Sequence, residues 1–128
     1  MSTNFDKFAI LDSFVDEVAS YLPEIEANLD RLQQQPTNQE AIEETYRRAH
    51  TIGGSAAMMD FSALAQVAQG MEAILGNALD GASRLDGPTI ALLRRSFGRL
   101  SRLLEMARTG ADGSQLLAEE AGDGPGCK

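Results

Sequence analysis

The chain has few residues that could cross-link a small fold or bind a soft metal. Among its 128 residues there is one cysteine, Cys127, and one histidine, His50. A lone cysteine cannot form an internal disulfide, and one residue of each kind is too few for a zinc site. No apolar run approaches the length of a membrane span. The first ten residues, MSTNFDKFAI, lack the basic and then apolar pattern of a signal peptide. We therefore expect a cytoplasmic protein.

Positive charge is also scarce, because 11 lysines and arginines stand against 19 aspartates and glutamates, for a formal net charge of −8. A surface of this sign would repel phosphates, which argues against a nucleic-acid partner. The charge is uneven along the chain. Acidic residues of the first third include Asp12, Asp16, Glu17, Glu24, Glu26 and Asp30, and the late arginines are Arg94, Arg95, Arg99, Arg102 and Arg108. We expect the two segments to lie side by side and neutralise each other, with a functional basic face as the alternative.

Apolar residues recur at three- and four-residue steps in four long segments, and no segment has a convincing strand pattern. We expect helices over residues 6–34, 37–59, 62–78 and 88–110. Four helices without strands predict an all-α fold. Because the connections between them are short, we expect an antiparallel four-helix bundle over residues 1–110. Ser114 could cap a short fifth helix, followed by a flexible glycine-rich tail, within residues 111–128.

Two signals concern the first two helices. Pro23 lies inside the first pattern, where proline removes a hydrogen bond and clashes with the preceding turn, so we expect a kink or a break near Ser20. The letters TNQE at the start of the second helix form a capping box. In it the Thr37 hydroxyl would meet the Glu40 amide while Glu40 reaches back.

The later helix boundaries carry similar signals. Asp60 is a plausible terminator of the second helix, because aspartate tolerates the left-handed conformation better than most residues. Ser62 is expected to cap the third helix. Pro88 suits the first position of the fourth, which should end at Gly110.

The most unusual stretch is YRRAHTIGGSAAMMDF, residues 46–61, in which two glycines follow the lone histidine by three and four residues. Each glycine inside a helix costs about 1 kcal/mol relative to alanine. On a helical wheel, His50 lies away from the core-facing arc, beside Arg47, Gly54 and Ala57, with Gly53 flanking Gly54. We interpret the glycines as clearing space for another macromolecule to reach the imidazole. A neutral imidazole has a free lone pair and can accept and pass on a transferring group.

An alternative interpretation is that the glycine pair ends the helix at Ile52. The following residues would then form a loop, and His50 would be a bystander in the last turn. Against this, the apolar spacing continues through Ser55 to Met59 with alanines and methionines, which favour helix.

The segment RRAHTIGGSAAMMDFSALAQVAQGMEAIL resembles the signature of histidine phosphotransfer (HPt) domains, including the N-terminal phosphoacceptor domains of chemotaxis-type histidine kinases. The family pattern is approximately R-x-x-H-[ST]-[LI]-K-G-[SG]-[SAG], then a glycine-aromatic pair, then a helix reading L-x-x-L-[AC]-H-x-[LM]-E. The matching residues are Arg47, His50, Thr51, Ile52, Gly54, Ser55, Ala56, Phe61, Leu64, Met71 and Glu72. With a similar first helix, the resemblance covers roughly residues 6–108.

The resemblance implies a phosphorelay intermediate of two-component signalling. His50 would accept a phosphoryl group from a kinase catalytic domain or a receiver aspartate and pass it to a response-regulator receiver domain. Glu72 would accept a hydrogen bond from the other ring nitrogen and so orient the imidazole; a solvated residue or a partner for Arg48 are the alternatives. The chain has no nucleotide-binding or metal-binding motif, so it would be a carrier rather than an enzyme, with Mg²⁺ held by the receiver.

Three positions depart from the family pattern. Gly53 replaces a lysine thought to help neutralise the phosphoryl group, although Arg47 could supply charge instead. Asp60 replaces the glycine before the aromatic residue, and Gln69 stands where many chemotaxis-type members have a second histidine. The loss of the lysine leaves a second hypothesis open, namely a degenerate module that docks receivers or kinases without efficient transfer.

Partner approach and docking are expected around His50. The predicted docking residues are Arg47, Gly53, Gly54, Ala57 and Gln69. A small apolar patch such as Ala57, Phe61 and Leu64 would complete this surface, although Phe61 is as well suited to the core.

Overall fold

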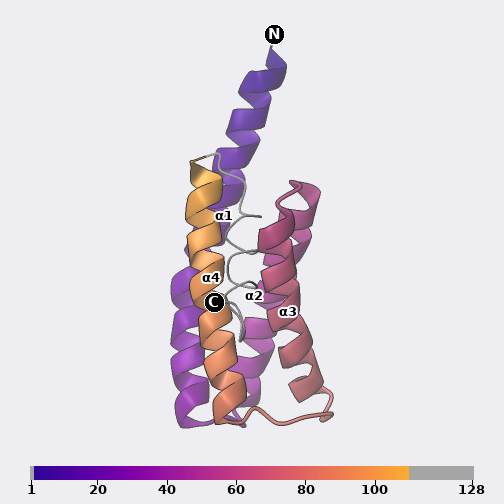
Figure 1. Ribbon diagram of the computed structural model, residues 1–128. Helices are drawn as coiled ribbons and strands as arrows, with labels where there is room; N and C mark the ends of the chain where they lie inside the picture. The colour runs from indigo at the N-terminus through magenta and orange to yellow at the C-terminus, as the bar shows by residue number, and fades with distance from the viewer. Residues whose placement is uncertain (1, 110–128) are drawn as a thin grey trace, which may run out of the picture.

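The protein consists of four helices, α1 (Ser2–Gln34), α2 (Gln39–Met58), α3 (Ser62–Leu79) and α4 (Gly87–Arg108) (Figure 1). The computed structural model describes residues 2–109, and side chains from Ile10 onward. No strand occurs within residues 2–109, which confirms the predicted all-α class. The predicted fifth helix and Gly110 lie outside the described residues.

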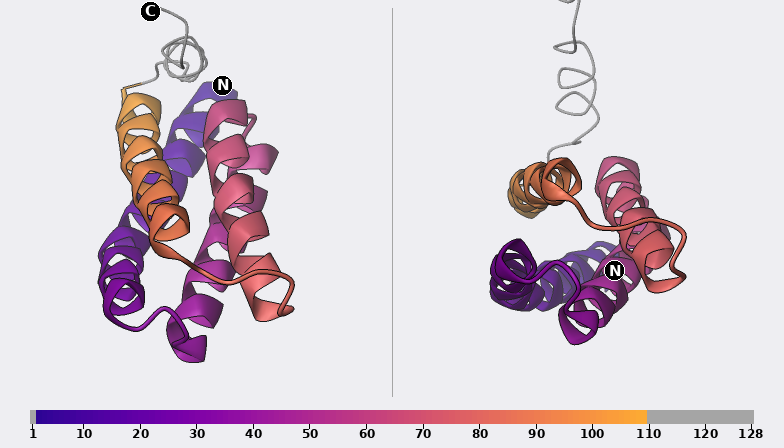
Figure 2. Two further views of the ribbon diagram at one scale, coloured as in Figure 1. Left: turned by 60° about the horizontal axis from the view of Figure 1, so that its bottom comes forward. Right: turned by 90° about the horizontal axis from the view of Figure 1, so that it is seen from below.

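Consecutive helices run in opposite directions and form a bundle, which the end-on view of Figure 2 shows as four corners. The main contacts join neighbours around the bundle: α1 with α2, α2 with α3, α3 with α4, and α4 with α1. A tight turn connects α2 to α3, whereas α3 and α4 are joined by a longer loop at the bottom of Figure 1. This is the predicted antiparallel four-helix arrangement.

The core is made by the apolar stripe of each helix, as the three- and four-residue spacing predicts. Leu29 of α1, Ile52 of α2, Leu75 of α3 and Leu93 of α4 are completely buried. Every buried side-chain nitrogen and oxygen among the described residues has a hydrogen-bond partner. The bundle therefore buries its polar groups without leaving any of them unpaired.

Helix α1 continues through Pro23. Of the two predicted possibilities near Ser20, a kink or a break, the break is therefore wrong. Proline removes one hydrogen bond and disfavours the helix locally. Val18 and Ile25, on either side of Pro23, are both buried against the other helices. Burying a large aliphatic side chain stabilises by about 1.5–3 kcal/mol, so tertiary packing outweighs the local penalty of about 3 kcal/mol.

The N-cap of α2 is Asn38 and not Thr37, so the predicted capping box is wrong by one residue. The Asn38 side-chain oxygen accepts a hydrogen bond from the backbone N–H of Ala41 at 3.1 Å. Asparagine is at least as good an N-cap as threonine, and the two residues are adjacent. The sequence pattern located the start of the helix but could not decide whether Thr37 or Asn38 is the N-cap.

The remaining boundaries follow the predictions with two exceptions. Asp60 has a φ of 63°, the left-handed conformation expected of the terminator. Ser62 is the first residue of α3 and does not cap it; the N-cap is Phe61, without a side-chain hydrogen bond. Asp86 caps α4, which begins at Gly87, so Pro88 is the second residue of that helix and not, as predicted, the first. The predicted start is therefore wrong by one residue.

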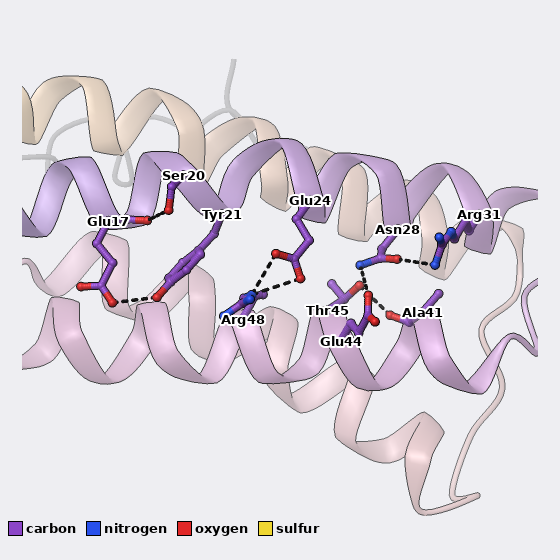
Figure 3. Close-up of polar contacts among 10 residues, drawn as sticks. All are labelled: Glu17, Ser20, Tyr21, Glu24, Asn28, Arg31, Ala41, Glu44, Thr45 and Arg48. Carbon is purple, nitrogen blue, oxygen red and sulfur yellow. Dashed lines mark hydrogen bonds and ion pairs between the residues drawn. The ribbon is translucent and has the colours of Figure 1, made fainter.

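A row of polar contacts joins α1 to α2 (Figure 3). Both Glu24 carboxylate oxygens accept from Arg48 Nε at 3.1 Å, and the Arg48 guanidinium lies 4.5 Å from the centre of the Tyr21 ring. The hydrogen bond to Glu24 raises the pKa of Arg48. Further along, the buried Asn28 donates to Glu44 at 3.2 Å. These contacts hold α2 in register against α1.

One of the late arginines, Arg94, contacts the acidic first helix, as expected for the two segments lying side by side. Arg94 of α4 donates to Asp30 and, at 2.7 Å, to Gln33 of α1. Because α1 and α4 are neighbours in the bundle, the charges of the two segments offset each other across this contact.

The cap assignment can be tested by Asn38→Ala, with Thr37→Ala as the matched control. Loss of the Asn38 cap should lower the free energy of unfolding by about 1 kcal/mol. Thr37→Ala should change it by less than about 0.5 kcal/mol, because exposed residues without a structural role contribute little. Urea denaturation followed by circular dichroism measures both. A larger loss for Thr37→Ala would contradict the assignment.

Candidate functional site

His50 lies within an unbroken helix. Helix α2 runs through both glycines to Met58, so the alternative in which the pair ends the helix at Ile52 is wrong. The His50 side chain is 68% exposed. A side chain on a regular helix is held more firmly than one on a loop.

The His50 ring contacts a carboxylate from the neighbouring helix. Its Nδ1 lies 2.7 Å from Oε2 of Glu72 on α3, and the Glu72 side chain is 24% exposed. A carboxylate only accepts hydrogen bonds, so the contact assigns the proton to Nδ1. In the neutral ring Nε2 then carries the free lone pair. The alternative pairing of Glu72 with Arg48 is wrong, because Arg48 pairs with Glu24 of α1.

The two glycines differ in their surroundings. At Gly54 an added Cβ would meet no atom within 4 Å, and the residue is exposed, as predicted. Gly53 is buried, and a Cβ there would lie 3.3 Å from Gln69 Cγ and 3.6 Å from Ala68 Cβ. The prediction that both glycines clear an exposed surface is therefore wrong for Gly53, which instead lets α2 and α3 approach closely.

The other predicted docking residues surround the histidine. Arg47 and Ala57 are exposed on α2, and Gln69 is exposed on α3. Arg47, whose side chain is 62% exposed, lies 3.8 Å from Glu43 in an ion pair one turn away. The predicted apolar patch holds only in part. Leu64 is buried.

Phe61 does not serve the predicted patch either. It is partly buried, and its ring stacks on Phe14 of α1 with ring centres 5.5 Å apart. Its backbone N–H donates to Ala56 O at 2.9 Å, which closes the turn between α2 and α3. Phe61 therefore contributes to the packing of the bundle.

One neighbour of the histidine was not predicted. The Tyr46 ring lies one turn before His50 on α2, with ring centres 6.4 Å apart and planes 15° from parallel. Residues four apart share a helix face, so the spacing could have identified this pair. Tyr46 also lines a shallow hollow beside the histidine together with Gln69, Glu72 and Gly76 of α3.

Two further searches of the described residues gave no candidates. Within residues 2–109 no three histidine, cysteine, aspartate or glutamate side chains gather into a group that could hold a metal ion. None of the four helices over this range is both long enough and apolar enough to cross a bilayer.

Residues 9–110 match the family profile described as the Hpt domain. The chain therefore belongs to the Hpt domain family, whose members are phosphoryl-carrier modules. The fold agrees with this assignment, because the solved CheA phosphotransferase domain from Thermotoga maritima superposes with a TM-score of 0.70. That match has 28% sequence identity and covers 74% of this chain and 90% of the other.

Several similar proteins are far longer than this chain. Chemotaxis protein CheA of Treponema pallidum is 29% identical over 113 residues, 85% of this chain and 14% of that protein. CheA of Listeria monocytogenes is 25% identical over 96% of this chain and 19% of its own length. The gliding motility regulatory protein of Myxococcus xanthus is 30% identical over 98% of this chain and 17% of its own length. The chain thus spans less than a fifth of these relatives.

The different surroundings of the glycines predict different effects of alanine. Gly54→Ala should raise the free energy of unfolding by about 0.5–1 kcal/mol, because alanine favours helix and the new methyl group meets nothing. Gly53→Ala should give a smaller gain or a loss, since Gln69 must move to admit it. Thermal or urea unfolding of the two variants measures the difference. Equal gains would mean that Gly53 does not limit the approach of α3.

Proposed function

We propose that this domain is a phosphorelay intermediate of two-component signalling, in which His50 receives a phosphoryl group and passes it on. The observation that carries the proposal is the 2.7 Å contact between Nδ1 of an exposed His50 and Glu72. It leaves Nε2 as the nucleophile on the solvent-accessible ring. The donors and acceptors we propose are a kinase catalytic domain and the receiver domain of a response regulator.

In exchange with a receiver, the Nε2 lone pair of His50 attacks the phosphorus of the receiver's aspartyl phosphate. The new N–P bond forms as the P–O bond to the aspartate breaks, and the aspartate leaves as a carboxylate. Nδ1 keeps its proton, so the phosphorylated ring carries a positive charge beside the Glu72 carboxylate. A Mg²⁺ ion on the receiver would neutralise the phosphoryl oxygens, and return of the group is the same step reversed.

The missing lysine at Gly53 makes a second source of positive charge relevant. Arg47 lies one turn before His50, and its ion pair with Glu43 is long and exposed. Such surface pairs contribute little, about 0–1 kcal/mol, so the guanidinium is free to turn toward an incoming phosphoryl group. We propose that Arg47 takes part of the role of the family lysine.

The absence of the lysine at Gly53 also favours a second candidate function. If Arg47 does not compensate for Gly53, the domain would dock receivers or kinases through Gly54, Ala57 and Gln69 without efficient transfer. The two candidates differ in one measurable respect, since only the first places a phosphoryl group on His50.

Incubation with a ³²P-labelled, phosphorylated receiver domain tests the main proposal. The wild-type domain should acquire acid-labile, base-stable label, and His50→Gln should acquire none. Glu72→Ala should slow labelling by roughly 10- to 100-fold, by analogy with the loss on removing a hydrogen-bond partner that orients a metal-bound histidine. Glu105→Ala, which removes an exposed carboxylate on α4, is the control and should label at the wild-type rate.

The outcomes separate the two candidates. Receiver binding without any label on the wild-type domain would support the docking module and overturn the relay. Label that persists in His50→Gln would place the acceptor elsewhere and overturn both the relay step and its assignment to His50.

The open space at Gly54 can be tested by filling it. Gly54→Gln should lower the rate of transfer from a receiver by about 10- to 100-fold, because a small misplacement of the reacting groups is costly. Labelling by phosphoramidate, a small donor that needs no docking, should stay unchanged. Gly98→Gln on α4, where an added Cβ likewise meets nothing within 4 Å, is the control. An unaffected receiver rate would remove Gly54 from the approach surface.

A further inference from the structure

The Tyr46 side chain is seated on a bare stretch of α3 backbone. An added Cβ at Gly76 would lie 3.3 Å from Cε1 and 3.8 Å from Cδ1 of the Tyr46 ring. The first of these distances is tighter than ordinary van der Waals contact, so a side chain at residue 76 would require the ring to move by a few tenths of an ångström. Glycine disfavours a helix interior relative to alanine, and the contact with Tyr46 gives it a reason to be there.

The same ring lies almost parallel to the imidazole. The Tyr46 and His50 planes are 15° apart and their centres 6.4 Å apart, within the range of offset aromatic pairs. Tyr46 is half-buried, so its position is constrained from α3, whereas the His50 side chain is mostly exposed. The constrained ring can therefore restrict the freer one.

The hydrogen bond to Glu72 alone does not hold the imidazole in one orientation. A single contact between Nδ1 and Oε2 joins two side chains that each rotate about their own bonds. The Glu72 carboxylate can therefore follow the imidazole, and the ring can still tilt as His50 turns about χ1 and χ2. Such a tilt carries the Nε2 lone pair away from one direction of attack. A second restraint on the plane of the ring is needed to hold that direction.

We infer that Tyr46, seated on Gly76, is a positioning residue that restricts the plane of the His50 ring while Glu72 holds Nδ1. The effect of Tyr46 on phosphoryl transfer rests on the proposed function, whereas its effect on the orientation of the His50 ring does not. A nucleophile held in the attack geometry reacts faster than one that samples many orientations. Tyr46 touches no transferring group and acts through His50.

The first test uses phosphoramidate as the donor, so that receiver docking plays no part. In this reaction the P–N bond of phosphoramidate breaks, ammonia leaves, and the phosphorus bonds to Nε2 of His50. Tyr46→Leu should lower the rate by about 2- to 10-fold, the range that an aromatic pair contributes beyond its buried area. Tyr46→Phe keeps the ring and should restore the rate to within about twofold of wild type.

Substitutions of glycines in α3 test the contact between the Tyr46 ring and Gly76 without altering either aromatic ring. Gly76→Ala should displace Tyr46 and slow phosphoramidate labelling in the same direction as Tyr46→Leu. Gly70→Ala, on the same helix where a Cβ would meet nothing within 4 Å, should leave the rate unchanged. Both substitutions improve helix propensity equally, so a difference between them reports on the ring contact.

Nuclear magnetic resonance of the unphosphorylated domain gives a readout that does not depend on transfer. In the wild type, ¹⁵N shifts of His50 should indicate the tautomer protonated at Nδ1, and its ring protons should show the ring-current shift of Tyr46. Tyr46→Leu and Gly76→Ala should reduce that tautomer preference, and Gly70→Ala should not.

The inference is overturned if Tyr46→Leu has the wild-type rate and spectrum, or if Gly76→Ala behaves like Gly70→Ala. If the wild-type domain takes no label from phosphoramidate or a receiver, the proposed function fails. The spectra of the unphosphorylated variants then still decide whether Tyr46 positions the ring.

Discussion

The close approach of α2 and α3 is the constraint on which the site depends, because its two polar groups come from different helices. The 2.7 Å contact between His50 and Glu72 requires the two backbones to be held near each other at this level. Gly53 is buried against Ala68 and Gln69 at this interface. A glycine within a helix forfeits about 1 kcal/mol relative to alanine, so this part of the hairpin gives up local helix stability in favour of close packing.

The rest of the bundle supplies the rigidity that this arrangement needs. Arg48 of α2 forms an ion pair with Glu24 of α1, and Arg94 of α4 forms one with Asp30 of α1. Both α2 and α4 are thus linked to α1. Fully buried aliphatic residues from all four helices fill the space between them. A site supported by regular elements on every side keeps its geometry better than one built on loops. His50 is thus displayed on a stable scaffold while its own side chain stays accessible.

Membership of the Hpt domain family and the position of His50 suggest a division of chemistry between partners. Phosphoryl transfer depends mainly on positioning and on neutralising charge. This domain would supply an oriented nucleophile, and the partner would supply most of the neutralisation. Gly53, in place of the lysine that the family pattern has, makes Arg47 the residue on which this chain's own contribution of positive charge would rest.

Much of the fold could be predicted from local pattern. The apolar spacing predicted all four helices, and the short connections predicted their antiparallel order, because a helix must bury its apolar stripe against a neighbour. Asp60 and Pro88 marked helix boundaries through backbone preferences that act within a few residues. The cap at Asn38 was predicted wrongly, and so was the break that Pro23 suggested as one of two possibilities. In the first case adjacent residues competed for the same role, and in the second long-range packing outweighed a local penalty.

For the site, the sequence by itself determined which residue is the exposed imidazole and which face of its helix carries it, since a wheel and a motif are properties of one segment. The geometry between segments was decided only by the tertiary structure. That geometry includes the burial of Gly53 against Gln69, the stacking of Phe61 on Phe14 and the seat of Tyr46 on Gly76. The physical reason is that contacts between helices depend on how far one is shifted and rotated against the other. Packing of the whole bundle decides this shift and rotation, so they cannot be predicted from the sequence of any single helix.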